Sequence, residues 1–73
     1  MTNRENKFIE LAEKRMNKVI NQMRLIGNLS NSSNYSYSKT QANKIINRLN
    51  SEMNNIKHRF KHGGNIDKEE FKL

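Results

Sequence analysis

The two histidines are the residues whose spacing comes closest to a chemical site. His58 and His62 lie four positions apart, which places both rings on one face of a helix, where they could bind a metal ion. No acidic residue lies between them or beside them to complete a ligand set, and Lys57, Arg59 and Lys61 would repel a cation. We therefore expect no metal site and no cofactor.

Acid–base and nucleophilic catalysis have equally little support in the sequence. The carboxylates that precede the last eleven residues are Glu5, Glu10, Glu13 and Glu52. The first three are explained by helix capping and by pairing with a lysine one turn away, as Glu10 with Lys14. The serines of residues 27–38 have no His or Lys placed beside them by a catalytic motif. We expect a protein that is not an enzyme.

The charge of the chain favours a polyanionic partner. Fourteen Lys and Arg stand against seven Asp and Glu, which gives a net charge of +7 at pH 7. Candidate phosphate-binding residues are Arg4, Lys7, Lys14, Arg15, Lys18, Lys44 and Arg48. Tyr35 and Tyr37 could stack on unpaired bases, but no named DNA- or RNA-binding motif occurs in the chain. Nucleic-acid binding is therefore the alternative function, through Lys and Arg contacts to phosphates.

The composition also indicates the cellular compartment in which the protein is expected. The chain has no cysteine, so it can form neither a disulfide nor a thiolate metal site. The N-terminal residues are polar and lead into no apolar stretch of the kind that a secretory signal contains. No apolar run approaches the roughly 18 residues that a membrane span requires. We expect a cytoplasmic protein that does not bind a membrane.

The residues named so far lie on two expected helices, the first over residues 3–26. Thr2 and Glu5 have the spacing of a capping box at its start. Gly27 stands where a left-handed residue commonly follows a helix. At about 100° per residue, one set of apolar side chains falls within an arc of about 120° and predicts a core-facing stripe. These are Phe8, Ile9, Ala12, Met16, Val19, Ile20, Met23 and Ile26.

The second helix is expected over residues 39–62. Ser38 and Gln41 form a second capping box, and Gly63 with Gly64 ends the helix. Its apolar residues recur at alternating spacings of three and four, as in the seam of a short coiled coil. They are Ala42, Ile46, Leu49, Met53, Ile56 and Phe60, with Ile45 beside them.

The two helices predict an all-α fold, an antiparallel helical hairpin over residues 1–62 with a hinge at 27–38. The hinge is rich in Asn and Ser, which compete with helical hydrogen bonds through their own side chains. A chain this short has a small core of its own, so we expect two copies to form a four-helix bundle. For the tail at 63–73, the sequence leaves open one docked helical turn or disorder.

Two leucines lie outside the stripe of the first helix. Leu11 and Leu25 fall on the same side as Arg4, Lys7, Lys14, Arg15 and Lys18, and we call these five cations the basic flank. The leucines are either two solitary exposed residues or apolar anchors for a partner. On the second interpretation the candidate partner-binding residues are Leu11, Arg15, Lys18, Leu25, Tyr35 and Tyr37.

The stretch from Asn6 to Phe60 resembles a family of small uncharacterised helical proteins encoded by bacterial plasmids, phages and other mobile elements. The resemblance is carried by Phe8-Ile-Glu-Leu-Ala-Glu-Lys-Arg, Arg24-Leu-Ile-Gly-Asn-Leu-Ser-Asn and Ser33-Asn-Tyr-Ser-Tyr, followed by Ile45, Ile46 and Leu49. It implies an accessory role in a mobile element and no particular activity. Together with the missing nucleic-acid motif, it favours a small binding or regulatory protein whose partner is a bacterial or mobile-element protein.

Overall fold

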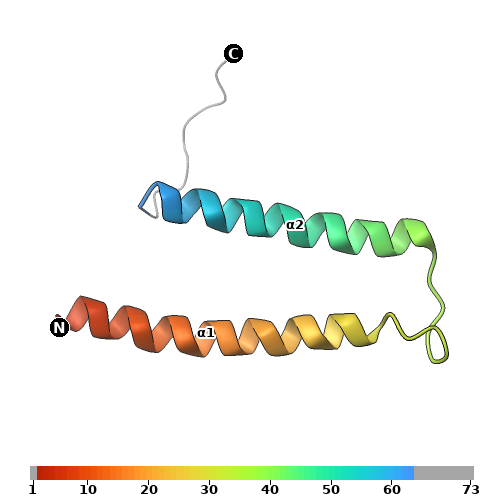
Figure 1. The fold of residues 1–73 in the computed structure, drawn as a ribbon, viewed down its shortest axis with the longest axis horizontal. Helices are drawn as coiled ribbons and strands as arrows, with labels where there is room; N and C mark the ends of the chain where they lie inside the picture. The colour runs from red at the N-terminus through yellow and green to blue at the C-terminus, as the bar shows by residue number, and fades with distance from the viewer. Residues whose placement is uncertain (1, 64–73) are drawn as a thin grey trace, which may run out of the picture. The chain divides into compact units, whose positions relative to one another are not determined.

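The fold is all-α, as predicted. The computed structural model describes residues 2–63, and within that range it contains two helices and no strand. Helix α1 spans Asn3–Asn28 and helix α2 spans Lys39–Lys61 (Figure 1). The chain divides into two units, Met1–Ser36 around α1 and Tyr37–Leu73 around α2. Neither helix is apolar enough over a sufficient length to span a membrane.

Helix α1 starts where the sequence predicted, with one change in the cap. The Thr2 hydroxyl oxygen accepts a hydrogen bond from the Glu5 backbone N–H at 3.1 Å. The Glu5 carboxylate, however, accepts from the Thr2 hydroxyl, at 3.3 Å between Oγ1 and Oε1. The predicted return bond to the Thr2 backbone is replaced by this side-chain contact, so only half of the capping box forms.

Helix α1 ends two residues later than expected, at Asn28. Gly27 lies inside the helix, and Gly63 is the one described residue with a positive φ. The prediction that Gly27 ends the helix in a left-handed conformation is therefore wrong. The chain instead leaves the helix through right-handed turns, because Leu29 N–H donates to Ile26 O and Ser30 N–H to Gly27 O, both at 3.0 Å.

Asn31 organises the segment between the helices, residues 29–38. Its backbone N–H donates to Asn28 O at 3.3 Å, and its own carbonyl accepts from Asn34 and Tyr35 N–H at 3.1 and 3.0 Å. Its side-chain Oδ1 accepts from Ser33 N–H at 2.9 Å, which is an Asx turn. An asparagine therefore supplies the side-chain competition with helical bonding that the composition of this segment predicted.

Helix α2 begins at Lys39 as its sequence signals indicate, and it ends at Lys61, one residue before the expected end. The complete capping box between Ser38 and Gln41 begins it, and His62 is the C-cap. Gly63 follows with a φ of +68°, and its N–H donates to Phe60 O at 3.4 Å. A left-handed glycine directly after the cap is the usual way to close a helix. Of the predicted tail at 63–73, all but Gly63 lies outside the described residues.

Candidate binding surfaces

The apolar stripe of α1 is exposed to solvent along its whole length. No described residue is buried, and the large side chains of this stripe are between 36% exposed, at Ile26, and 59% exposed, at Phe8. Ala12 alone among the stripe residues is half-buried. A single helix has no second layer against which to bury a stripe. The apolar side chains of the stripe therefore remain in contact with solvent.

Helix α2 has a stripe of the same kind. Ile45, Ile46, Met53 and Ile56 are all exposed, and Phe60 is 71% exposed, while Ala42 and Leu49 are half-buried. Twelve large apolar side chains are thus exposed on the two stripes together. Isolated exposed apolar residues are ordinary, but a continuous row along a helix indicates an interaction surface.

The basic flank of α1 is a second, chemically different surface on the same helix. Its five cations are exposed, and none of them forms an ion pair among residues 2–63. The pairing of Glu10 with Lys14 that the sequence predicted is not formed. The helix therefore holds Arg4, Lys7, Lys14, Arg15 and Lys18 together on one face as uncompensated charges.

The residues predicted to bind a protein partner differ in exposure. Leu25, Tyr35 and Tyr37 are 57%, 50% and 46% exposed, which suits apolar anchors. Leu11 is half-buried instead of solitary and exposed. Its neighbours one turn away include Lys7 and Arg15, whose long aliphatic stems can cover an apolar side chain.

The remaining candidates for phosphate binding lie on α2. Lys44 and Arg48 are one turn apart on that helix, in the other unit of the chain. Arg48 Nε donates to Glu52 Oε2 at 2.9 Å, an ion pair between side chains that are 79% and 53% exposed. Sequence inspection missed this pair, although the spacing of four residues is its signal. A carboxylate at this distance competes with a phosphate for the guanidinium group.

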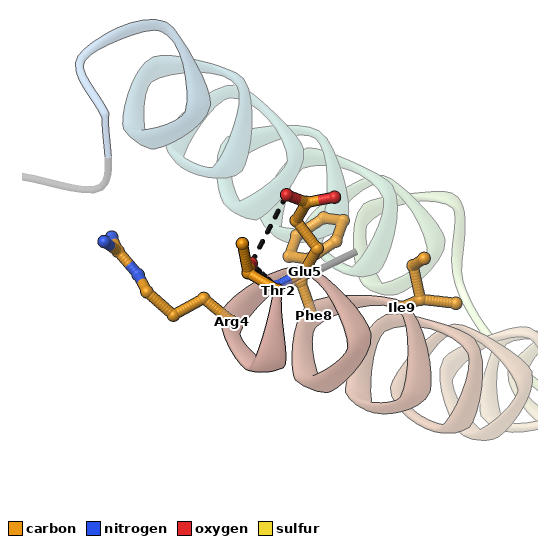
Figure 2. Close-up of a pocket in the computed structure, with 5 residues that line it drawn as sticks. All are labelled: Thr2, Arg4, Glu5, Phe8 and Ile9. Carbon is orange, nitrogen blue, oxygen red and sulfur yellow. Dashed lines mark hydrogen bonds between the residues drawn. The ribbon is translucent and has the colours of Figure 1, made fainter.

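The structure also has a shallow depression at the start of α1, which the sequence did not predict. It is lined by Thr2, Arg4, Glu5, Phe8 and Ile9, all exposed and all from α1 or its cap. Figure 2 shows Arg4 and Ile9 extending away from each other on two sides of the first turns. Small-molecule sites enclose most of the ligand surface, which side chains from one exposed helix turn cannot do. The depression contains the first residues of both surfaces, since Phe8 and Ile9 belong to the apolar stripe and Arg4 belongs to the basic flank.

The histidines stand close together, as their spacing requires. The ring centroids of His58 and His62 are 4.4 Å apart, with the planes tilted by 59°. Within residues 2–63, no group of three or more metal-ligating side chains comes together. The exposed features of the described residues are thus the two apolar stripes and the basic flank.

The chain matches no protein family model, and comparison with curated proteins and with solved structures gives no match.

Proposed function

We propose that the protein is a small, non-enzymatic binding or regulatory protein that acts through protein–protein interaction. The observation that supports this proposal is the exposure of both apolar stripes along α1 and α2. Complete burial of one Val, Leu, Ile, Met or Phe side chain contributes about 1.5–3 kcal/mol. Twelve such side chains exposed on two helices form a strong driving force for association.

A hairpin that pairs with a second copy of itself can bury both stripes without any other protein. Helices of 26 and 23 residues are about 39 and 35 Å long at ~1.5 Å per residue, so they suit antiparallel packing. Two hairpins that pack with their stripes inward make a four-helix bundle. We propose this homodimer as the functional form.

The surface that contacts another protein would then lie outside the stripes. Leu25, Tyr35 and Tyr37 lie within thirteen residues, at the end of α1 and in the segment that follows, and each is about half exposed. Tyrosine is enriched in protein interfaces and among residues that dominate binding energy. The resemblance to mobile-element proteins suggests that the partner is a bacterial or mobile-element protein in the cytoplasm.

Affinity capture from the host, with and without nuclease, tests this function. We expect the tagged protein to retain a protein partner after nuclease treatment. A variant with Leu25→Ala, Tyr35→Ala and Tyr37→Ala should lose that partner while its melting temperature stays unchanged. Release of all captured protein by nuclease would contradict the proposal. A fall of several degrees in melting temperature would show that the tyrosines serve the fold instead of recognition.

A further inference from the structure

The basic flank of α1 has a geometry that the proposed protein interface does not use. At about 100° per residue, its five cations lie within an arc of about 100° of the helix surface. No Asp or Glu falls inside that arc, all five side chains are exposed, and none is ion-paired among residues 2–63. From Arg4 to Lys18 the row is about 21 Å long at ~1.5 Å per residue.

We propose that the basic flank binds the phosphate backbone of duplex nucleic acid without reading its sequence. Duplex DNA carries one negative charge per about 1.7 Å of its axis when both strands are counted, so about 21 Å of duplex carries about 12 phosphates, more than the five contacts that the flank can make. Five exposed cations along that length can each reach a phosphate in many registers. Because these cations have no carboxylate partners, no ion pair has to break when they bind a phosphate.

The composition of the flank favours phosphate over a protein surface. Three of its five cations are lysines, a residue type that is depleted in protein interfaces but serves as a point charge for phosphate. The apolar residues on the same side are Leu11 and Leu25, and Leu11 is already half-buried. Leu25 is exposed but lies seven residues beyond Lys18, so along the row of cations itself little apolar area is available to stabilise a protein contact.

The position of the flank also disfavours a membrane surface. A helix that lies in a bilayer interface buries its apolar face in the lipid. The centre of the apolar stripe of α1 lies about 130° around the helix from the centre of the flank, at about 100° per residue. Lipid that covered the stripe would leave most of the flank facing away from the headgroups.

A duplex fits better than a single strand. Proteins that bind single strands stack bases on aromatic side chains. The flank holds no aromatic residue, and Phe8, the aromatic residue of α1, belongs to the apolar stripe. Arg48 of α2 is outside the proposed site because Glu52 already pairs with it.

Binding of a short labelled DNA duplex of mixed sequence, measured by fluorescence anisotropy over a salt series, tests the assignment. Five phosphate contacts predict a slope of log affinity against log salt of about −4.5, at about −0.9 per phosphate. Affinity should then fall roughly 500-fold between about 50 and 200 mM salt. The variant Lys7→Gln, Lys14→Gln and Lys18→Gln removes three contacts and should have a slope of about −1.8.

The matched control removes three cations that lie elsewhere and belong to no candidate site, with Arg24→Gln, Lys57→Gln and Lys61→Gln. Because its net charge equals that of the test variant, it should keep a slope near −4.5 if the flank is the site. Equal loss of slope in both variants would overturn the proposal, as would unsaturable binding by the native protein. Equal or tighter binding to a poly-glutamate peptide, or to vesicles of anionic lipid, would overturn the choice of nucleic acid.

Both triple variants should keep the helical content of the native chain, because glutamine is nearly as good a helix former as lysine. The inference does not depend on the proposed protein interface or dimer, since the flank lies outside both stripes. Loss of partner capture in the Leu25, Tyr35 and Tyr37 variant with DNA binding unchanged would separate the two activities.

Discussion

Ser38 and Gln41 cap the start of α2 reciprocally. The Ser38 hydroxyl oxygen accepts from the Gln41 backbone N–H at 3.0 Å, and Gln41 Oε1 accepts from the Ser38 backbone N–H at 2.9 Å. Two backbone donors that no helical carbonyl can reach are satisfied in this way. The contact sets the point at which the Asn- and Ser-rich segment gives way to helix.

Replacing Ser38 with Ala should therefore lower the free energy of unfolding by about 1 kcal/mol, the usual effect of losing an N-cap side chain. The matched control is Ser36→Ala, two residues earlier in the irregular part of the segment, which should change stability by less than about 0.5 kcal/mol. Denaturant unfolding followed by circular dichroism measures both. Equal effects of the two substitutions would show that the cap does not stabilise α2.

The elements of this fold were predictable because their signals are local. Ser38 with Gln41 predicted the first turn of α2, and Gly63 predicted its end, since both depend only on residues within one turn. Gly27 misled because a glycine is compatible with a left-handed cap and also with a helix interior. Which of the two occurs depends on whether Leu29 and Ser30 continue the hydrogen bonding, as they do here.

Gly27 and Gly63 should consequently respond in opposite directions to alanine. Gly27 has a helical φ, and a Cβ there would meet no atom within 4 Å, so Gly27→Ala should stabilise α1 by about 0.5–1 kcal/mol. Gly63→Ala should destabilise the end of α2, because its φ of +68° is strained for a residue with a side chain. Helical content and melting temperature check both. Destabilisation by Gly27→Ala would contradict the helical position of Gly27.

The ion pair between Arg48 and Glu52 should contribute little to stability. Both side chains are largely exposed, and the acid follows the base along the helix, which is the less favourable order. Glu52→Gln should therefore change the free energy of unfolding by less than about 0.5 kcal/mol. Denaturant unfolding at low and high salt measures this. A larger loss that disappears at high salt would show that the pair is more important than its exposure indicates.

The candidate surfaces were only partly predictable from the sequence. The stripes follow from periodicity alone, because residues at spacings of three and four share a helix face wherever the helix lies. Side-chain pairing does not follow in this way. Glu10 and Lys14 have the favourable order yet remain apart, while Arg48 and Glu52 have the unfavourable order and meet. Exposed charges of this kind differ by tenths of a kcal/mol, which spacing cannot resolve.

The self-association of the full chain tests the central claim, that the exposed stripes are covered by protein. Sedimentation should show a dimer at micromolar concentration for the native chain. Met53→Asp places a charge in the stripe of α2 and should abolish the dimer and reduce helical content, because burial of an unpaired carboxylate is costly. Asn54→Asp adds the same charge one position away, outside the stripe, and should leave the dimer intact. A native chain that sediments as a monomer and melts cooperatively would contradict the account.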